Sequence, residues 1–205
     1  MSHPHDHAAL PVPREVTLPT EPATTVRLAW RAVPEGTPRR ETAWALLREL
    51  LAPGTELTNP CPRCGGPHGP VRTTDASARP AVAYAGAVAV VAVADAGPGG
   101  FAIDAEAESD PVRDAAGLRG VLGTRTGVGL RDWVRTEAAL KADSRGLRVD
   151  PGTVVITPVG TAAWHATVPG GAAVSGWDLD GPPGILVSVA LSGGARAAGA
   201  DPATR

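Results

Sequence analysis

Apolar and polar residues alternate in several short stretches of the first half of the chain, and this two-residue period is typical of β-strands. Residues 26–33 show the pattern first. Thr37 and Pro38 then open a helix, because threonine is a good N-cap and proline fits the first helical position. Residues 81–94 are rich in β-branched valine, which predicts two short strands joined by a turn.

The second half has a similar order of elements. Residues 101–106 predict a strand, residues 111–122 a weaker helix and residues 130–142 a stronger one. Further strands are expected at residues 153–157, 162–168, 173–177 and 185–191. Because each half consists of a strand, helical material and returning antiparallel strands, we predict an α+β fold of two similar subdomains packed side by side.

The expected subdomains cover residues 23–98 and 99–192. Residues 1–22 are rich in proline and histidine without periodicity and predict a disordered tail, and residues 193–205 predict a loose C-terminal tail. The N-terminus shows no charged-then-apolar leader, and no apolar run reaches transmembrane length. We therefore expect a cytoplasmic protein without a membrane partner, and a monomer, since both halves lie in one chain.

The charged residues are nearly balanced in sign, and the cations are almost all arginine. The net charge of -2 gives no global basic field, so nucleic acid is not expected as a partner. Lys141 is the single lysine, against eighteen arginines. Where arginine serves as the general cation, a retained lysine marks a position that needs a compact ammonium group.

Two carboxylates on the strand at 101–106 are the first candidate for chemistry. Asp104 and Glu106 lie two residues apart, so both side chains point to the same face. Such a pair repels unless it faces water or is bridged by a cation, and a hard divalent ion suits carboxylate oxygens. By itself the pair favours an acidic strand end in solvent over a metal site.

A stripe along the helix at 130–142 is the second candidate. Trp133, Glu137 and Lys141 follow one another at intervals of four residues and therefore share one helix face. Taken alone, this stripe also fits a tryptophan anchored in the core beside an exposed Glu–Lys pair, which contributes about 0.3 kcal/mol.

Together these segments resemble the 4'-phosphopantetheinyl transferase superfamily. That family has a G-[IV]-D-[IVL]-E strand, a W-x-x-K-E-x-x-x-K helix and a G-x-G-L-like turn. This chain reads F-A-I-D-A-E over 101–106, W-V-R-T-E-A-A-L-K over 133–141 and A-D-S-R-G-L over 142–147. Residues 61–69, C-P-R-C-G-G-P-H-G, are similar to the C-x-x-C-G-x-x-H-G segment of its monomeric, surfactin-type branch.

The resemblance implies two pseudo-symmetric halves, each an antiparallel sheet packed with a helix, with the active site in the cleft between them. It implies transfer of 4'-phosphopantetheine from coenzyme A to a serine of an acyl or peptidyl carrier protein, with Mg²⁺ as the metal. Asp104, Glu106 and Glu137 match the metal-binding acids. Glu137 would also help to deprotonate the serine, and Lys141 matches the lysine near the reacting phosphate.

The coenzyme A cradle matches only in part. Arg39, Arg40 and Arg72 lie where the family has basic residues near the nucleotide, and an arginine fork suits phosphate. Tyr84 replaces the family's phosphate-binding histidine, and Thr136 replaces the lysine of W-x-x-K-E. A catalytically impaired relative that binds carrier protein or nucleotide is therefore an alternative.

The Cys-x-x-Cys segment has its own alternatives. Cys61, Cys64 and His68 provide three zinc-ligand types, and a fourth ligand would have to come from elsewhere, such as Asp75 or the N-terminal histidines. The sequence shows no second ligand pair of the kind that zinc sites usually have. An interaction protein organised around this Cys/His loop is the remaining functional class.

Overall fold

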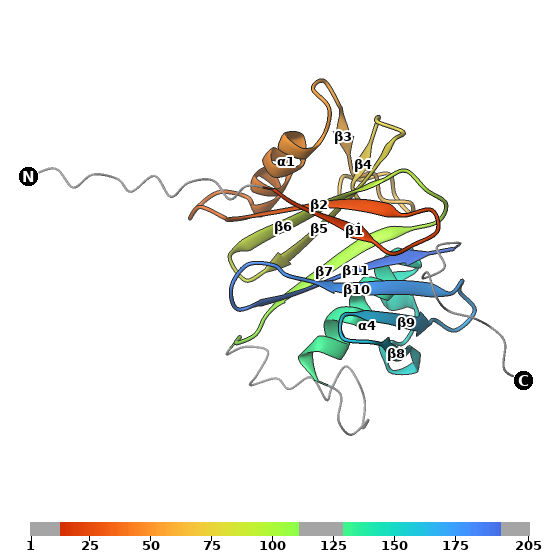
Figure 1. Cartoon of the computed structure of the whole chain (residues 1–205). Helices are drawn as coiled ribbons and strands as arrows, with labels where there is room; N and C mark the ends of the chain where they lie inside the picture. Colours follow the sequence, from red (N-terminus) through yellow and green to blue (C-terminus); the bar gives the residue numbers. More distant parts are fainter. Residues whose placement is uncertain (1–12, 111–128, 194–205) are drawn as a thin grey trace, which may run out of the picture.

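The computed structural model of this chain describes residues 13–110 and 129–193. Two antiparallel sheets pack against each other, and a helix covers the outer face of each (Figure 1). The first sheet has the strand order β1-β2-β6-β5. Its strands are β1 (Arg14–Leu18), β2 (Thr24–Ala32), β5 (Ala78–Ala85) and β6 (Val88–Asp95), and its helix is α1 (Arg39–Leu50). A small ribbon of β3 (Leu57–Thr58) and β4 (Arg72–Thr73) lies between α1 and β5 in the chain.

The second sheet has the strand order β7-β11-β10-β9-β8. Its strands are β7 (Phe101–Ala107), β8 (Val155–Val159), β9 (Ala163–Thr167), β10 (Val174–Leu179) and β11 (Ile185–Ser192). Helix α4 (Leu130–Ala142) packs on its outer face, and two short 3₁₀ turns, η1 (Gly146–Arg148) and η2 (Pro151–Thr153), lead from the helix into β8. Every one of these strand pairs is antiparallel.

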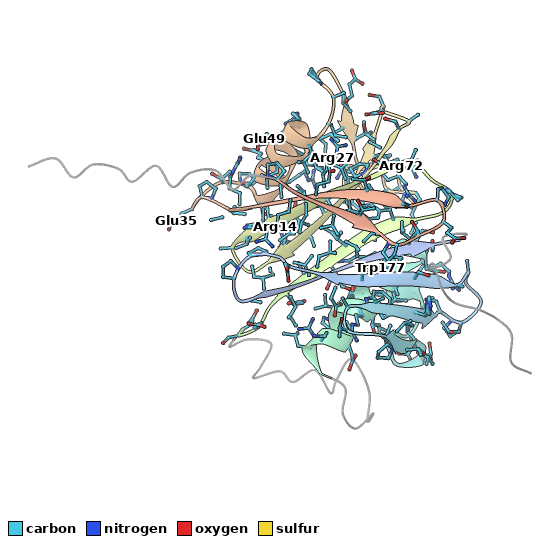
Figure 2. The ribbon with its side chains drawn as sticks, viewed as in Figure 1. Arg14, Arg27, Glu35, Glu49, Arg72 and Trp177 are labelled. Carbon is cyan, nitrogen blue, oxygen red and sulfur yellow. The ribbon has the colours of Figure 1, made fainter. Side chains whose placement is uncertain are left out.

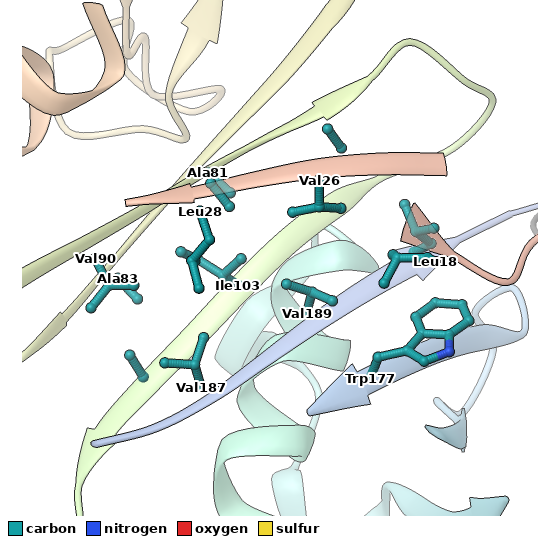
Figure 3. Close-up of a cluster of buried hydrophobic side chains, with 14 of the residues drawn as sticks. Leu18, Val26, Leu28, Ala81, Ala83, Val90, Ile103, Trp177, Val187 and Val189 are labelled. Carbon is teal, nitrogen blue, oxygen red and sulfur yellow. The ribbon is translucent and has the colours of Figure 1, made fainter. Parts of the chain in front are cut away.

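The face that the two sheets share is filled by apolar side chains (Figure 3). Leu18, Leu28 and Val90 come from the first sheet, and Ile103 and Val189 from the second. Each is at most 1% exposed. A fully buried aliphatic side chain contributes about 1.5–3 kcal/mol, so this shared core holds the two sheets together as one unit.

The other face of each sheet packs against its helix. Leu46 and Leu47 of α1 lie in one cluster with Val91 of β6. Leu140 of α4 lies in another with Trp164 of β9. The two-residue period explains this arrangement, because alternate residues of a central strand face the other sheet and the helix in turn.

The prediction of an α+β fold with antiparallel sheets and helices is confirmed. The helix expected at 130–142 has those bounds. Helix α1 begins at Arg39 with Pro38 as its N-cap and no side-chain cap, so the prediction that Thr37 caps it was wrong. In both sheets, the strand that precedes the helix in the chain pairs with the last strand, β2 with β6 and β7 with β11.

The prediction of a disordered tail over residues 1–22 was wrong for part of that range. Residues 14–18 form β1, whose Val16 lies opposite Val26 of β2, and Leu18 is buried. An edge strand obtains its hydrogen bonds and its apolar contacts from its neighbour, so its own segment carries little signal. Residues 1–12, the helix expected at 111–122 and residues 194–205 of the expected C-terminal tail lie outside the described residues.

Candidate functional site

A pocket of about 930 Å³ lies where the two halves of the chain meet. Residues of α1, of the loop after it and of β5 line one part, and residues of β7, the end of α4 and the following turn line the other. Its lining includes the cations Arg39, Arg40, Lys141 and Arg145, against a single acid, Glu41. This charge pattern suits an anionic ligand.

Tyr84 and Arg39 form one contact inside this pocket. The Arg39 guanidinium lies 4.6 Å from the centre of the Tyr84 ring, within the range of a cation–π interaction. Burial raises the pKa of Tyr84, although Arg39 and Arg40 act in the opposite direction. Tyr84 is therefore a neutral phenol at physiological pH, able to donate a hydrogen bond but not to supply positive charge.

Asp104 and Lys141 connect the second sheet to its helix. The Lys141 Nζ donates a hydrogen bond to the Asp104 Oδ1 at 2.5 Å. Asp104 is only 5% exposed, and this burial raises its pKa to about 6. Lys141 lowers that pKa, and the charges of Glu137 and Glu106 raise it. Burial and two further acids thus outweigh the attraction of one lysine.

Glu137 lies one helical turn before Lys141 and belongs to the same group of charges. Burial raises its pKa, Lys141 lowers it and the charge of Glu106 raises it. Strands and helices hold all four groups: Asp104 and Glu106 share the α4-facing side of β7, and Glu137 and Lys141 lie on α4. The two acids of the strand and the Glu–Lys pair of the helix therefore form one cluster of interacting charges.

The donor set of this cluster fits a hard divalent ion. The Asp104 Oδ2 is buried and has no hydrogen-bond partner, which leaves one carboxylate oxygen for another ligand. The carboxylate oxygens of Asp104, Glu106 and Glu137 do not all lie within 4.8 Å of one another. Among the residues described, the one group of three or more acids, cysteines or histidines with all ligand atoms within 4.8 Å is Cys61, Cys64 and His68.

Arg72 and Arg135 do not line the pocket. Arg72 lies on β4 (Figure 2) and is not among the residues that line the pocket. Arg135, next to the position at which the resembled motif has lysine, forms a buried ion pair with Asp178 at 2.6 Å. Thr136 is buried as well. Neither position 135 nor position 136 supplies a free cation to the pocket.

Arg145 is a pocket residue that the sequence did not single out. It follows α4 and lines the same pocket as Lys141, and its guanidinium donates hydrogen bonds to Asp143 at 2.5 Å and to the Pro169 carbonyl oxygen at 2.9 Å. Its place in the turn at 142–147 was a usable signal, because the chain turns there directly after the lysine.

The sequence matches no protein-family model and no curated protein. None of the described helices combines the length and the apolar character that crossing a membrane requires.

Proposed function

We propose that this chain transfers 4'-phosphopantetheine from coenzyme A to a serine of an acyl or peptidyl carrier protein, with Mg²⁺ as the metal. The observation that carries this proposal is the position of Lys141. Lys141 lines the cationic pocket, and its ammonium group binds the buried carboxylate of Asp104. A phosphate ligand and a metal-binding acid would therefore meet at one side chain.

The pocket suits the nucleotide part of coenzyme A. A volume of about 930 Å³ is at the upper end of small-molecule sites. Arg39 and Arg40 provide guanidinium forks for phosphate oxygens, and Tyr84 provides a neutral hydrogen-bond donor. The Arg145 fork already binds the Asp143 carboxylate. Because Arg72 does not line the pocket, we leave it out of the proposed cradle.

Asp104, Glu106 and Glu137 would hold the metal ion. When bound, the ion would neutralise charge on the diphosphate and orient it for displacement. The buried Asp104 Oδ2, which has no hydrogen-bond partner, supports a ligand at this point. Carboxylates whose pKa values burial has raised, next to a cationic pocket, are also common at functional sites.

Glu137 and Lys141 would act on the reacting groups. The serine oxygen attacks the β-phosphorus of coenzyme A, the bond to 3',5'-ADP breaks, and the serine proton passes to the Glu137 carboxylate. The raised pKa of Glu137 makes it a better proton acceptor than an exposed glutamate. The Lys141 ammonium would stabilise the negative charge of the departing nucleotide.

We further propose that the two halves are pseudo-symmetric and that the cleft between them is the active site. The equivalent pairing of β2 with β6 and of β7 with β11 supports this relation. Since both halves of the pocket come from one chain, the proposed enzyme acts as a monomer.

The test is to incubate the protein with Mg²⁺, coenzyme A and an apo carrier protein and to measure the mass of the carrier. We expect a gain of one phosphopantetheine group on its serine. Glu137→Gln should abolish the gain, because an amide neither accepts the proton nor completes the metal site. Glu56→Gln, an exposed position on the same chain, is the matched control and should keep full activity. No gain with the unaltered protein, or unchanged turnover in Glu137→Gln, would contradict the proposal.

A binding protein without transferase activity is the second candidate, favoured by Tyr84. The phenol cannot carry the positive charge of the histidine in the resembled motif, and Arg39 already occupies its ring face. Calorimetry with coenzyme A separates the two candidates, since binding without any mass gain on the carrier would favour this one.

A further inference from the structure

Cys61, Cys64 and His68 converge on the loop between β3 and β4. Their ligand atoms all lie within 4.8 Å of one another, and the Cys64 Sγ and the His68 Nε2 are 3.5 Å apart. Tetrahedral zinc, with sulfur at about 2.3 Å and nitrogen at about 2.1 Å, places such ligands about 3.6 Å apart. The separation of Cys64 and His68 therefore already matches this spacing, and Cys61 lies within 4.8 Å of both.

Backbone hydrogen bonds hold the loop in this shape. The Cys61 N–H donates to the Gly66 carbonyl oxygen and the Gly65 N–H donates to that of Cys61, both at 2.8 Å. The Gly69 N–H closes the loop on the Asn59 carbonyl oxygen at 2.7 Å. Gly65 has a φ of 72°, the left-handed region in which glycine is favoured. The turn after the second cysteine therefore favours glycine at position 65.

Close approach explains a second glycine in the loop. A Cβ added to Gly66 would lie 3.2 Å from the His68 ring and 3.4 Å from the Cys64 Sγ. The chain therefore passes directly beside two of the three ligands, and a side chain at this position would press against them.

The loop also favours the thiolate form that metals bind. The pKa of Cys61 is lowered to about 7, mostly by hydrogen bonds from the backbone N–H groups of Arg63 and Cys64 and to a smaller extent by the Cys64 side chain and His68. A thiol with a lowered pKa releases its proton to solvent more readily when a metal binds.

A fourth protein ligand is not present among the described residues, since no further acid, cysteine or histidine belongs to the group. Asp75, which the sequence suggested, instead accepts hydrogen bonds from the backbone N–H and the hydroxyl of Ser77. Three protein ligands and an open position is a coordination that zinc adopts with water as the fourth ligand.

The same loop forms part of the pocket wall. Asn59, His68, Gly69 and Pro70 all line the pocket described above. Whatever fixes the loop therefore fixes this wall.

From these contacts we propose that Cys61, Cys64 and His68 bind one Zn²⁺, with water at the fourth position, and that the ion holds residues 59–70 in place as a wall of the pocket. This zinc site does not depend on the transferase reaction proposed for the pocket.

Cobalt titration tests the ligand set, because Cys61 and Cys64 are the only cysteines of the chain. Reduced, metal-free protein titrated with Co²⁺ should show a thiolate-to-cobalt charge-transfer band that saturates at one equivalent and disappears when Zn²⁺ is added. Cys61→Ser and Cys64→Ser should each remove about half of its intensity, since one of two thiolates remains. His68→Ala should weaken binding at least about tenfold.

A matched control addresses the remaining histidines. Replacing His3, His5 and His7 together by alanine should leave the band unchanged, and so should His165→Ala. Absence of the band in the reduced protein, its persistence at full intensity in Cys61→Ser, or its loss in the triple histidine variant would each overturn the proposed ligand set.

Hydrogen exchange tests the wall. With Zn²⁺ bound, the hydrogen-bonded amides of Cys61, Gly65 and Gly69 should exchange at least about tenfold more slowly than in the metal-free protein, and amides of β11 should not change. Equal exchange rates in the loop with and without Zn²⁺ would overturn this part of the proposal.

Discussion

Asp104→Asn perturbs the buried carboxylate at the centre of the candidate site. The side chain is 5% exposed, and its burial raises the pKa from 3.8 to about 6. At 1.36 kcal/mol for each pKa unit, ionised Asp104 costs the metal-free protein about 3 kcal/mol in free energy of unfolding. Asparagine has nearly the same shape and never ionises, so it removes this cost.

The sign of the effect follows from proton linkage. A carboxyl with a raised pKa binds its proton more tightly in the folded state, so its contribution to stability is fully present below pH 3.8 and is lost as the pH rises through about 6. The free energy of unfolding of Asp104→Asn minus that of the wild type should therefore increase by about 2–3 kcal/mol between pH 4 and pH 8. Taking the change with pH cancels any constant effect, such as the loss of the Lys141 hydrogen bond.

Urea unfolding followed by tryptophan fluorescence, in buffer with a chelator, measures this difference at each pH. Asp180→Asn, whose carboxylate is 98% exposed, is the control and should behave like the wild type at both ends of the range. Adding Mg²⁺ should stabilise the wild type and leave Asp104→Asn unchanged. A difference that stays flat or decreases with pH would show that the Lys141 contact, and not burial, dominates the energetics of Asp104.

Other substitutions test the pocket, the core and the loop. Tyr84→His should tighten coenzyme A binding by calorimetry, because an imidazolium adds charge at the pocket; equal affinity would mean that residue 84 does not reach the phosphates. Leu140→Ala should lower the free energy of unfolding by about 2–5 kcal/mol, whereas Leu147→Ala, 69% exposed, should change it by less than about 0.5 kcal/mol; equal effects would contradict the packing of α4. Gly69→Ala should weaken Co²⁺ binding, because its Cβ would meet the Pro60 carbonyl oxygen; unchanged affinity would argue that this closure does not shape the site.

Most of the elements follow from local patterns. In the helix at 130–142 and in the strand that begins at residue 101, most of the apolar positions of the sequence are positions that the fold buries. Residues 14–18 were misassigned, because pairing with β2 supplies what that segment's own pattern lacks. The first helical residue of α1 was also misplaced, since a threonine before a proline indicates a cap without requiring one.

In the candidate site, too, the sequence predicted some relations between residues and not others. The two-residue period of a strand put Asp104 and Glu106 on one face, and the helical period put Glu137 and Lys141 on one stripe. The spacing of Cys61, Cys64 and His68 was enough to suggest a metal site. These relations involve neighbours in the chain, so local geometry suffices to predict them.

Relations between distant segments required the packed sheets. Nothing in the local pattern shows that Lys141 binds Asp104, that Arg145 joins Arg39 and Arg40 in one pocket, or that Arg72 does not line it. The contact of Lys141 with Asp104 depends on how α4 packs on β7, and the pocket depends on how the shared core aligns one sheet on the other. Many side chains contribute to that alignment at once, so it belongs to the folded chain as a whole and not to any segment of it.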